Sequence, residues 1–258
     1  MKKTFFIAIV LIALPLAGQT QKPPDLIVVI SIDQFRYDYL TRFAPYFSAG
    51  GFNRAMQHGA DFRRALYPYS TTYTGPGHAA IGTGYTPSHS GIIANTWLDR
   101  LTGKPQYCVA DDRARGGFSP VNLDSDSLGD RTRERYNGSK VIGIALKDRA
   151  AILMAGRKAS AAYWFDSKLP GFTSSSYYHA NQTLLTGFNK SVSTYTAAHP
   201  QWTQSQFIPQ ADLERMTHDP PALRKYKTRM DGLGVEFPHP IQSIAALEDT
   251  PFGNDLVL

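Results

Sequence analysis

Two long apolar runs constrain the fold of this 258-residue chain more than any other feature. Residues 26–32 (Leu-Ile-Val-Val-Ile-Ser-Ile) and 140–146 (Lys-Val-Ile-Gly-Ile-Ala-Leu) are rich in β-branched side chains. Such runs are typical of strands buried on both faces, as in a parallel sheet. Helical spacing of apolar residues follows each run, over residues 36–47 and 150–155. The sequence therefore predicts an α/β domain with a mainly parallel sheet.

Weaker patterns predict the other elements of this domain. Beyond Gly171 prolines recur from Pro200 to Pro251, so we interpret that part as an insertion or cap and not as more sheet. Short strands or irregular segments, with a turn between them, are expected at residues 91–99, 101–104 and 107–111. We expect further helices over residues 52–58, 77–84 and 126–136, and further strands over residues 60–66 and 161–165.

The N-terminus has the layout of a secretory signal peptide. Lys2 and Lys3 precede an apolar run, Phe5–Leu14, which is too short to span a bilayer comfortably, and small residues follow it. We therefore expect export to the bacterial periplasm or medium, without stable membrane insertion after cleavage. The predicted organisation is a signal peptide at 1–18, the N-terminal part of a catalytic domain at 19–170, and at 171–258 an insertion or cap with the continuation of that domain.

Charge and cysteine content narrow the class of protein. The formal net charge is +6, which would favour anionic substrates but also fits an ordinary basic surface. No dense stripe of lysine and arginine is present, so we expect no nucleic-acid partner. Cys108 is the only cysteine, which excludes an intrachain disulfide. An exported chain without disulfides is more typical of a periplasmic enzyme than of a small secreted scaffold.

Asp33 and Thr74 are the first candidate site residues. Asp33 follows the first apolar run, and open α/β sheets bind ligands at the carboxyl ends of their strands, so its carboxylate is a candidate metal ligand. Thr74 precedes a Gly-Pro-Gly turn and a predicted helix, where backbone N–H groups and the helix dipole favour an anion. Its hydroxyl is a candidate nucleophile. For both residues, a helix N-cap is the alternative.

Asn95, Lys147 and Arg149 are the remaining candidates. Asn95 ends a short apolar stretch with an amide donor, and a turn residue is its alternative. Lys147 and Arg149 follow the second apolar run and should emerge on the same edge of the sheet as Asp33. Two cations with this spacing can hold a phosphoryl group, the arginine in bidentate fashion. Solvated surface charge is the alternative for this pair.

Four motifs, in this order, carry a resemblance to a known family: Ser31–Leu40, Tyr73–Ala79, His89–Asn95 and Ser139–Arg149. Together they resemble the alkaline phosphatase superfamily, in particular its type I phosphodiesterase/nucleotide pyrophosphatase branch. Within that branch they are similar to the bacterial phosphate-irrepressible alkaline phosphatases of the PafA type. The likeness extends from about residue 26 to the end of the chain and is strongest before residue 180.

The resemblance implies a three-layer α/β sandwich that hydrolyses small phosphate monoesters with two zinc ions. It assigns Asp33 as a zinc ligand and Thr74 as the nucleophile, which contacts the zinc pair and becomes phosphorylated. Asn95 would hydrogen-bond a phosphoryl oxygen, and Lys147 and Arg149 would contact the phosphoryl group in the transition state. Two metals about 4 Å apart would stabilise the attacking and leaving oxygens.

The sequence also departs from the family. Further Asp and His zinc ligands are expected from later strands, and no credible match is found. Glu214 and His218 have helical ligand spacing but lie in a polar, proline-bounded stretch, so we expect no metal there. We interpret the chain as an N-terminal fragment, inactive alone, with the nucleophile and phosphate contacts but an incomplete zinc site. Three further histidines are expected to be structural, namely His179, His199 and His239.

Two alternative functions stay open at this stage. The first is a phosphodiesterase or nucleotide pyrophosphatase of the same superfamily, although the Lys-x-Arg element at 147–149 favours monoesters by resemblance. The second is a non-catalytic exported binding protein on the same fold. The sequence leaves the natural substrate and the oligomeric state open.

Overall fold

The computed structural model describes residues 24–169, 171–217 and 237–258, which fall into two parts, one ending at Ile32 and one running from Asp33 to Leu258. The predicted signal peptide and His218 lie outside the described residues. Within the described ranges, no helix is long and apolar enough to cross a membrane.

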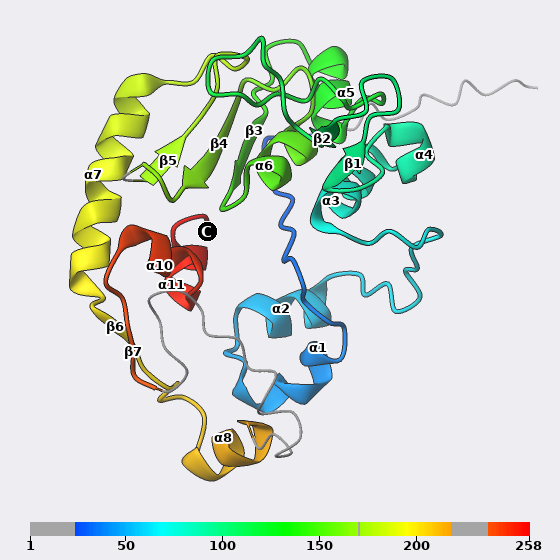
Figure 1. Cartoon of the computed structure of the whole chain (residues 1–258). Coiled ribbons are helices and arrows are strands. Elements are labelled where there is room, and N and C mark those ends of the chain that lie inside the picture. Colours follow the sequence, from blue (N-terminus) through cyan, green and yellow to red (C-terminus); the bar gives the residue numbers. More distant parts are fainter. Residues whose placement is uncertain (1–23, 170, 218–236) are drawn as a thin grey trace, which may run out of the picture. The chain divides into compact units, whose positions relative to one another are not determined.

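The second part contains mostly short helices and strands (Figure 1). The helices are α1 (Tyr39–Arg42), the 3-10 helix η1 (Ala44–Tyr46), α2 (Gly51–His58), α3 (Thr74–Thr83), α4 (Pro87–Ser90), α5 (Leu128–Arg135), α6 (Asp148–Ala155), α7 (Gln182–Ala198), α8 (Gln210–Thr217), α10 (Ile244–Glu248) and α11 (Pro251–Asp255). The strands are β1 (Thr96–Leu98), β2 (Pro105–Tyr107), β3 (Ile142–Ala145), β4 (Ala161–Asp166), β5 (Gly171–Thr173), β6 (Gln201–Trp202) and β7 (His239–Pro240).

The central sheet has three strands in the order β3-β4-β5. β3 pairs with β4 in parallel, with Ile142 opposite Ala161, as the second apolar run predicts. The connection between these two strands contains α6, which makes it a β–α–β unit. β5 pairs with β4 in the antiparallel sense, so the sheet is mixed. The expectation that no sheet lies beyond Gly171 is therefore wrong for β5, and also for β6 and β7, which pair as a two-stranded antiparallel sheet.

Helices cover both faces of β4, which gives three layers (Figure 1). Successive side chains of a strand point to opposite faces. Ala162 and Trp164 pack in one apolar cluster with residues of α3 and α6. Tyr163 and Phe165 pack in a second cluster with Val192 of α7. This alternation confirms the predicted layered α/β arrangement around the second apolar run.

The first apolar run does not form the predicted strand. Residues 26–32 have no helix or strand assignment, and the side chains of Leu26, Val28 and Ile30 are 77%, 66% and 63% exposed. A strand needs a neighbouring backbone for its hydrogen bonds, and in the described residues this run enters no β-ladder. β3 itself is buried less than predicted, because Ile142 and Ile144 are more than half exposed.

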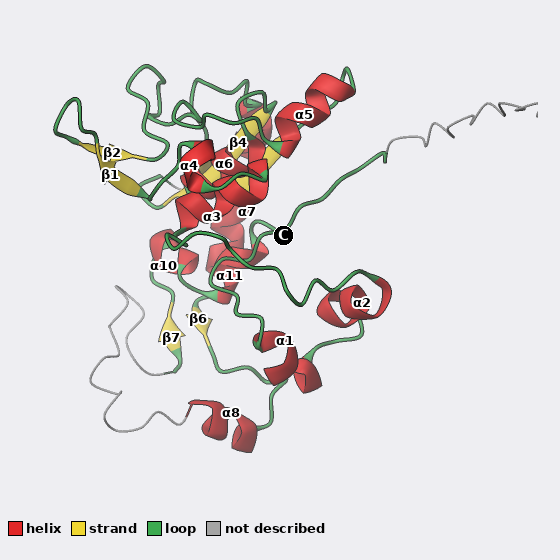
Figure 2. Ribbon diagram, turned by 90° about the vertical axis from the view of Figure 1, so that its right-hand side faces the viewer, coloured by secondary structure: helices red, strands yellow, loops and turns green. Residues whose placement is uncertain are grey.

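Most of the other predicted elements are confirmed with shifted ends. α2, α3, α5 and α6 lie where helices are expected, and β1 and β2 form an antiparallel hairpin around the predicted turn (Figure 2). The predicted helix at 36–47 is split into α1 and η1, with Pro45 in the first turn of η1. The predicted strand at 60–66 is wrong, since that segment consists of loop and turn. The sequence did not reveal α7, the longest described helix.

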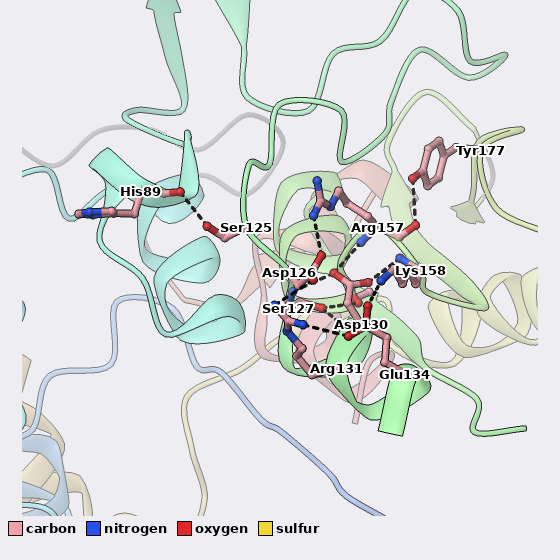
Figure 3. Close-up of polar contacts among 11 residues, drawn as sticks. His89, Ser125, Asp126, Ser127, Asp130, Arg131, Glu134, Arg157, Lys158 and Tyr177 are labelled. Carbon is pink, nitrogen blue, oxygen red and sulfur yellow. Dashed lines mark hydrogen bonds and ion pairs between the residues drawn. The ribbon is translucent and has the colours of Figure 1, made fainter. Parts of the chain in front are cut away.

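A polar cluster around Asp130 fixes the end of α6 (Figure 3). The buried Asp130 carboxylate accepts hydrogen bonds from the backbone N–H groups of Ser127, Arg157 and Lys158. The Ser127 hydroxyl accepts from the Asp130 N–H and donates to the Ala155 carbonyl. These bonds form a capping box at the start of α5 and hold the turn between α6 and β4. They therefore anchor one end of the helix whose other end carries Lys147 and Arg149.

Candidate active site

Thr74 and Asp33 meet at the start of α3. Thr74 is the first residue of the helix, and its Oγ1 donates a hydrogen bond of 3.0 Å to Asp33 Oδ2. The N-cap of α3 is Tyr73, and the N-cap of α1 is Asp38. The N-cap alternatives for Thr74 and Asp33 are therefore wrong, because each side chain contacts the other instead of capping a helix.

The backbone next to Asp33 has an unusual conformation. Gln34 has a φ of 58°, the one positive φ of a non-glycine residue in the described part of the chain. A side chain in this left-handed region is sterically disfavoured. The Gln34 N–H donates to Asp33 Oδ1 at 3.0 Å, so this turn orients the carboxylate with its Oδ2 toward Thr74.

The backbone N–H groups at the start of α3 are mostly bonded within the protein. Gly75 N–H donates to Asn95 Oδ1 at 2.7 Å, and Gly77 N–H donates to the Tyr73 carbonyl at 2.9 Å. Pro76 has no N–H to offer. The N–H groups of Gly75 and Gly77 therefore already have acceptors within the protein, and the helix dipole is the part of the predicted anion preference that does not depend on them.

Asn95 lies beside this helix start. Its Oδ1 accepts from Gly75 N–H, and its carbonyl accepts from Cys108 N–H at 2.9 Å. A Cβ atom added at Gly75 would lie 3.0 Å from Asn95 Oδ1 and 3.3 Å from Cys108 Sγ, so a glycine permits this close approach. The amide is thereby oriented with its oxygen toward the helix. Asn95 is thus more than a turn residue.

Cys108 forms part of the apolar floor below Gly75. The thiol is completely buried, and this burial raises its pKa to about 12 despite the nearby charge of Arg149. A protonated buried thiol behaves as a small apolar group and not as a nucleophile. Arg149 lies near this floor, since its Nη1 donates to the hydroxyl of Tyr107, the residue before Cys108.

Arg149 is held by a neighbouring tyrosine. Arg149 Nη1 donates to the Tyr107 hydroxyl at 3.0 Å, and that hydroxyl donates to Asp148 Oδ1 at 2.6 Å. Arg149 is half-buried, and its Nε is buried without a hydrogen-bond partner among the described residues. The solvated-surface alternative is therefore wrong for Arg149.

Lys147 contacts a different part of the chain from Arg149. It is the N-cap residue of α6, and its Nζ forms an ion pair with the carboxylate of Glu248 at the end of α10. The lysine side chain is 49% exposed, whereas that of Glu248 is 14% exposed. Asp33 and Thr74 thus contact each other, and Asn95 bonds the backbone of the next residue, Gly75. Arg149 bonds Tyr107, and Lys147 pairs with Glu248.

The described residues do not make up a complete metal site. Asp33 Oδ2 and Thr74 Oγ1 lie side by side, and oxygen donors of this kind fit one side of a zinc site. Within the described ranges, no group of three or more His, Cys, Asp or Glu side chains could hold a metal. Glu214 accepts a hydrogen bond from Gln210, and the rings of His199 and His239 pack against other aromatic rings.

Sequence reasoning missed three residues that contact the candidate site. Asp148 stands between Lys147 and Arg149 and could have been noticed from that position. Tyr107 is 42 positions before Arg149, and Glu248 is 101 positions after Lys147. No local pattern marks these two residues, because their role comes from the tertiary packing of β2 and α10.

Comparisons with known proteins identify the family. Residues 27–249 match the model of the type I phosphodiesterase/nucleotide pyrophosphatase family. The alkaline phosphatase PhoV of Synechococcus elongatus is 41% identical over 169 residues, which are 62% of this chain and 31% of PhoV. A protein of Myroides odoratus called a calcium-transporting ATPase is 39% identical over 185 residues, 68% of this chain and 34% of that protein.

Solved structures agree with this assignment. The crystal structure of wild-type alkaline phosphatase PafA matches with a TM-score of 0.74 and 31% identity, over 87% of this chain and 46% of PafA. A PafA variant with a threonine changed to serine, and an asparagine, a lysine and an arginine changed to alanine, matches with a TM-score of 0.75 and 28% identity, over 88% of this chain and 46% of that chain. The fold is thus alkaline-phosphatase-like, and the chain spans less than half the length of these relatives. The chain belongs to the type I phosphodiesterase/nucleotide pyrophosphatase family.

Proposed function

We propose that this chain carries the nucleophile and phosphate contacts of a zinc-dependent phosphate monoesterase. The observation that carries the proposal is the hydrogen bond between Thr74 Oγ1 and Asp33 Oδ2 at the start of α3. It places a hydroxyl beside a carboxylate at the positive end of a helix dipole, where a phosphoryl group is stabilised. Names of the matched relatives, PhoV and PafA, support the same reaction class.

Each residue has a distinct role in the proposed reaction. Thr74 Oγ attacks phosphorus in line with the leaving alcohol, and water then hydrolyses the resulting phosphothreonine. The Asp33 carboxylate accepts a hydrogen bond from the Thr74 hydroxyl and so orients that hydroxyl. The side-chain oxygen of Asn95 accepts a hydrogen bond from the Gly75 N–H, so its Nδ2 group can donate to a phosphoryl oxygen. Zinc held by Asp33 and Thr74 would lower the pKa of the hydroxyl.

Arg149 and Lys147 supply positive charge to the transferred group. An arginine binds two phosphoryl oxygens through its planar fork, and a lysine acts as a mobile point charge. The Nε of Arg149, which is buried without a hydrogen-bond partner among the described residues, supports its assignment as an anion contact. Lys147 must exchange Glu248 for the phosphoryl group, which its half-exposed, flexible side chain permits. The crystallised PafA variant supports these assignments, since its four substitutions fall on the same residue types as Thr74, Asn95, Lys147 and Arg149.

A second candidate is phosphodiester hydrolysis, which the name of the matched family favours. The two activities differ at Lys147 and Arg149, because a diester carries a second substituent where a monoester has a charged oxygen. We prefer monoester hydrolysis because two cations, Lys147 and Arg149, follow β3. The substrates would be small phosphorylated molecules, and the apolar N-terminal run supports a periplasmic or secreted location.

The test is a chimaera, because the chain spans 46% of PafA and the remaining zinc ligands of the family must be supplied. The chimaera is PafA with its matching segment replaced by residues 27–249 of this chain. We expect zinc-dependent hydrolysis of p-nitrophenyl phosphate, and a loss of about 100-fold or more when Lys147 and Arg149 are changed to alanine. Undiminished monoester hydrolysis in that double variant, or a stronger activity on bis-p-nitrophenyl phosphate, contradicts the proposal. Bound zinc and circular dichroism report whether each variant is folded.

A further inference from the structure

Tyr107 is the contact that fixes the guanidinium of Arg149. It is the last residue of β2, and its half-buried ring packs edge to face on Phe118, with ring centroids 6.2 Å apart. This packing directs the hydroxyl toward the start of α6. There it lies 2.6 Å from Asp148 Oδ1 and 3.0 Å from Arg149 Nη1.

The direction of these two hydrogen bonds follows from the chemistry of the groups. A tyrosine hydroxyl has one hydrogen to donate, whereas a carboxylate only accepts and a guanidinium only donates. The hydroxyl therefore donates to Asp148 and accepts from Arg149. Burial and the bond to Asp148 raise the pKa of Tyr107, so the phenol keeps its hydrogen at neutral pH. Asp148 Oδ1 also accepts from the Arg149 N–H at 2.6 Å, which closes the arrangement.

We propose that Tyr107 is a positioning residue that orients Arg149 toward the phosphoryl group, an inference that rests on the proposed function. The Tyr107 hydroxyl accepts a hydrogen bond from Nη1 of the Arg149 guanidinium, and this bond limits the rotation of the guanidinium. Nε is left without a partner in the described part of the chain, and Nη2 makes no hydrogen bond there. Nε and Nη2 form one edge of the planar fork, which is the edge that binds two oxygens of a phosphoryl group.

The experiment measures the affinity of the whole chain for inorganic phosphate by titration. Tyr107→Phe keeps the ring and its packing but removes the hydroxyl. We expect it to weaken phosphate binding about three- to tenfold, since one charge-assisted hydrogen bond no longer holds the guanidinium. Tyr178→Phe is the matched control, because the Tyr178 hydroxyl is buried in the same core without a partner among the described residues. That variant should bind phosphate as the unsubstituted chain does.

A double-variant cycle shows whether Tyr107 acts through Arg149. In an Arg149→Ala background, Tyr107→Phe should cause no further loss of phosphate affinity. The Nε–Hε resonance of Arg149, assigned by Arg149→Lys, should shift and sharpen in Tyr107→Phe as the side chain becomes mobile. An equal loss in both backgrounds, or an unchanged affinity in Tyr107→Phe, overturns the inference alone. Failure of the unsubstituted chain to bind phosphate also overturns the inference, whereas the proposed function fails only if the chimaera does not hydrolyse the monoester.

Discussion

Lys147 and Glu248 form an ion pair although 101 positions separate them in the sequence. The lysine precedes α6, and the glutamate ends α10, whose Ile244 packs against the apolar cluster on the α7 face of β4. A residue proposed to contact phosphate is thus paired with an internal carboxylate. Phosphate must displace that carboxylate before Lys147 can bind it.

Glu248→Gln should therefore strengthen phosphate binding. The change removes the competing charge but keeps the size of the side chain, and an ion pair of about 1 kcal/mol corresponds to roughly fivefold in affinity. Calorimetric titration of the chain with inorganic phosphate measures the effect. Glu134→Gln, which breaks the comparable pair with Lys158, serves as the control and should leave phosphate affinity unchanged. Weaker phosphate binding in Glu248→Gln would show that the glutamate supports Lys147 and does not compete for it.

Gly156→Ala should destabilise the turn that anchors α6. Gly156 has a φ of 88°, and an added Cβ would lie 2.0 Å from Ser127 Oγ, within the capping box of α5. We expect a loss of at least about 2 kcal/mol in the free energy of unfolding, from the strained φ and the lost cap together. Urea denaturation followed by circular dichroism measures it.

Gly138→Ala is the control that separates these two causes. Gly138 has a similar φ of 86°, but nothing lies within 4 Å of the position of its added Cβ. Its loss should be about 1 kcal/mol, because it includes the backbone strain without the collision. Equal losses at Gly156 and Gly138 would contradict the role assigned to the Asp130 cluster.

Asp111 should make stability fall in acid. The Arg113 side chain, and after it the Ser119 hydroxyl, hydrogen-bond the Asp111 carboxylate and lower its pKa to about 2. An aspartate in an unfolded chain has a pKa of about 3.9. The folded pKa is the lower one, so this stabilisation is complete above about pH 4 and is lost as the pH falls through about 2.

Unfolding curves between pH 2 and pH 5 check this expectation. Asp111→Asn should be less stable than the unsubstituted chain at pH 5, and the difference should shrink toward pH 2. Asp112→Asn changes the same charge at the exposed neighbouring position and should leave the pH dependence intact. A difference between Asp111→Asn and the unsubstituted chain that stays constant over this range would exclude the Asp111 carboxylate as the titrating group.

The sequence predicted the elements whose signals are local. The helix predicted at 77–84 corresponds to α3, although α3 begins at Thr74 and includes the Gly-Pro-Gly segment expected as a turn, and the run at 140–146 indicated β3. The apolar run at 26–32 has equal strand character, but apolarity does not supply a hydrogen-bonding neighbour, and no strand forms there. α7 was missed because its buried residues, Leu185 and Val192, are few and are separated by polar side chains.

The candidate site likewise combines residues that local motifs predict with residues that depend on tertiary packing. Thr74, Asp33, Asn95 and Arg149 were predicted from motifs at fixed places in the chain, and the structure bonds Thr74 to Asp33 and Asn95 to Gly75. The Tyr107 hydroxyl and the Glu248 carboxylate depend on how β2 and α10 pack, which no nearby residue encodes. Sequence patterns therefore predicted the candidate groups but not the tertiary contacts that these groups make.

Detection of phosphate on Thr74 tests the central claim most directly. The chimaera with residues 27–249 is incubated with zinc and p-nitrophenyl phosphate, quenched in acid, and digested for mass spectrometry. We predict a phosphopeptide modified at Thr74, retained as phosphoserine in Thr74→Ser and absent together with hydrolysis in Thr74→Ala. Zinc-dependent hydrolysis that persists in Thr74→Ala, or phosphate on a different residue, would contradict the assignment of Thr74 as the nucleophile.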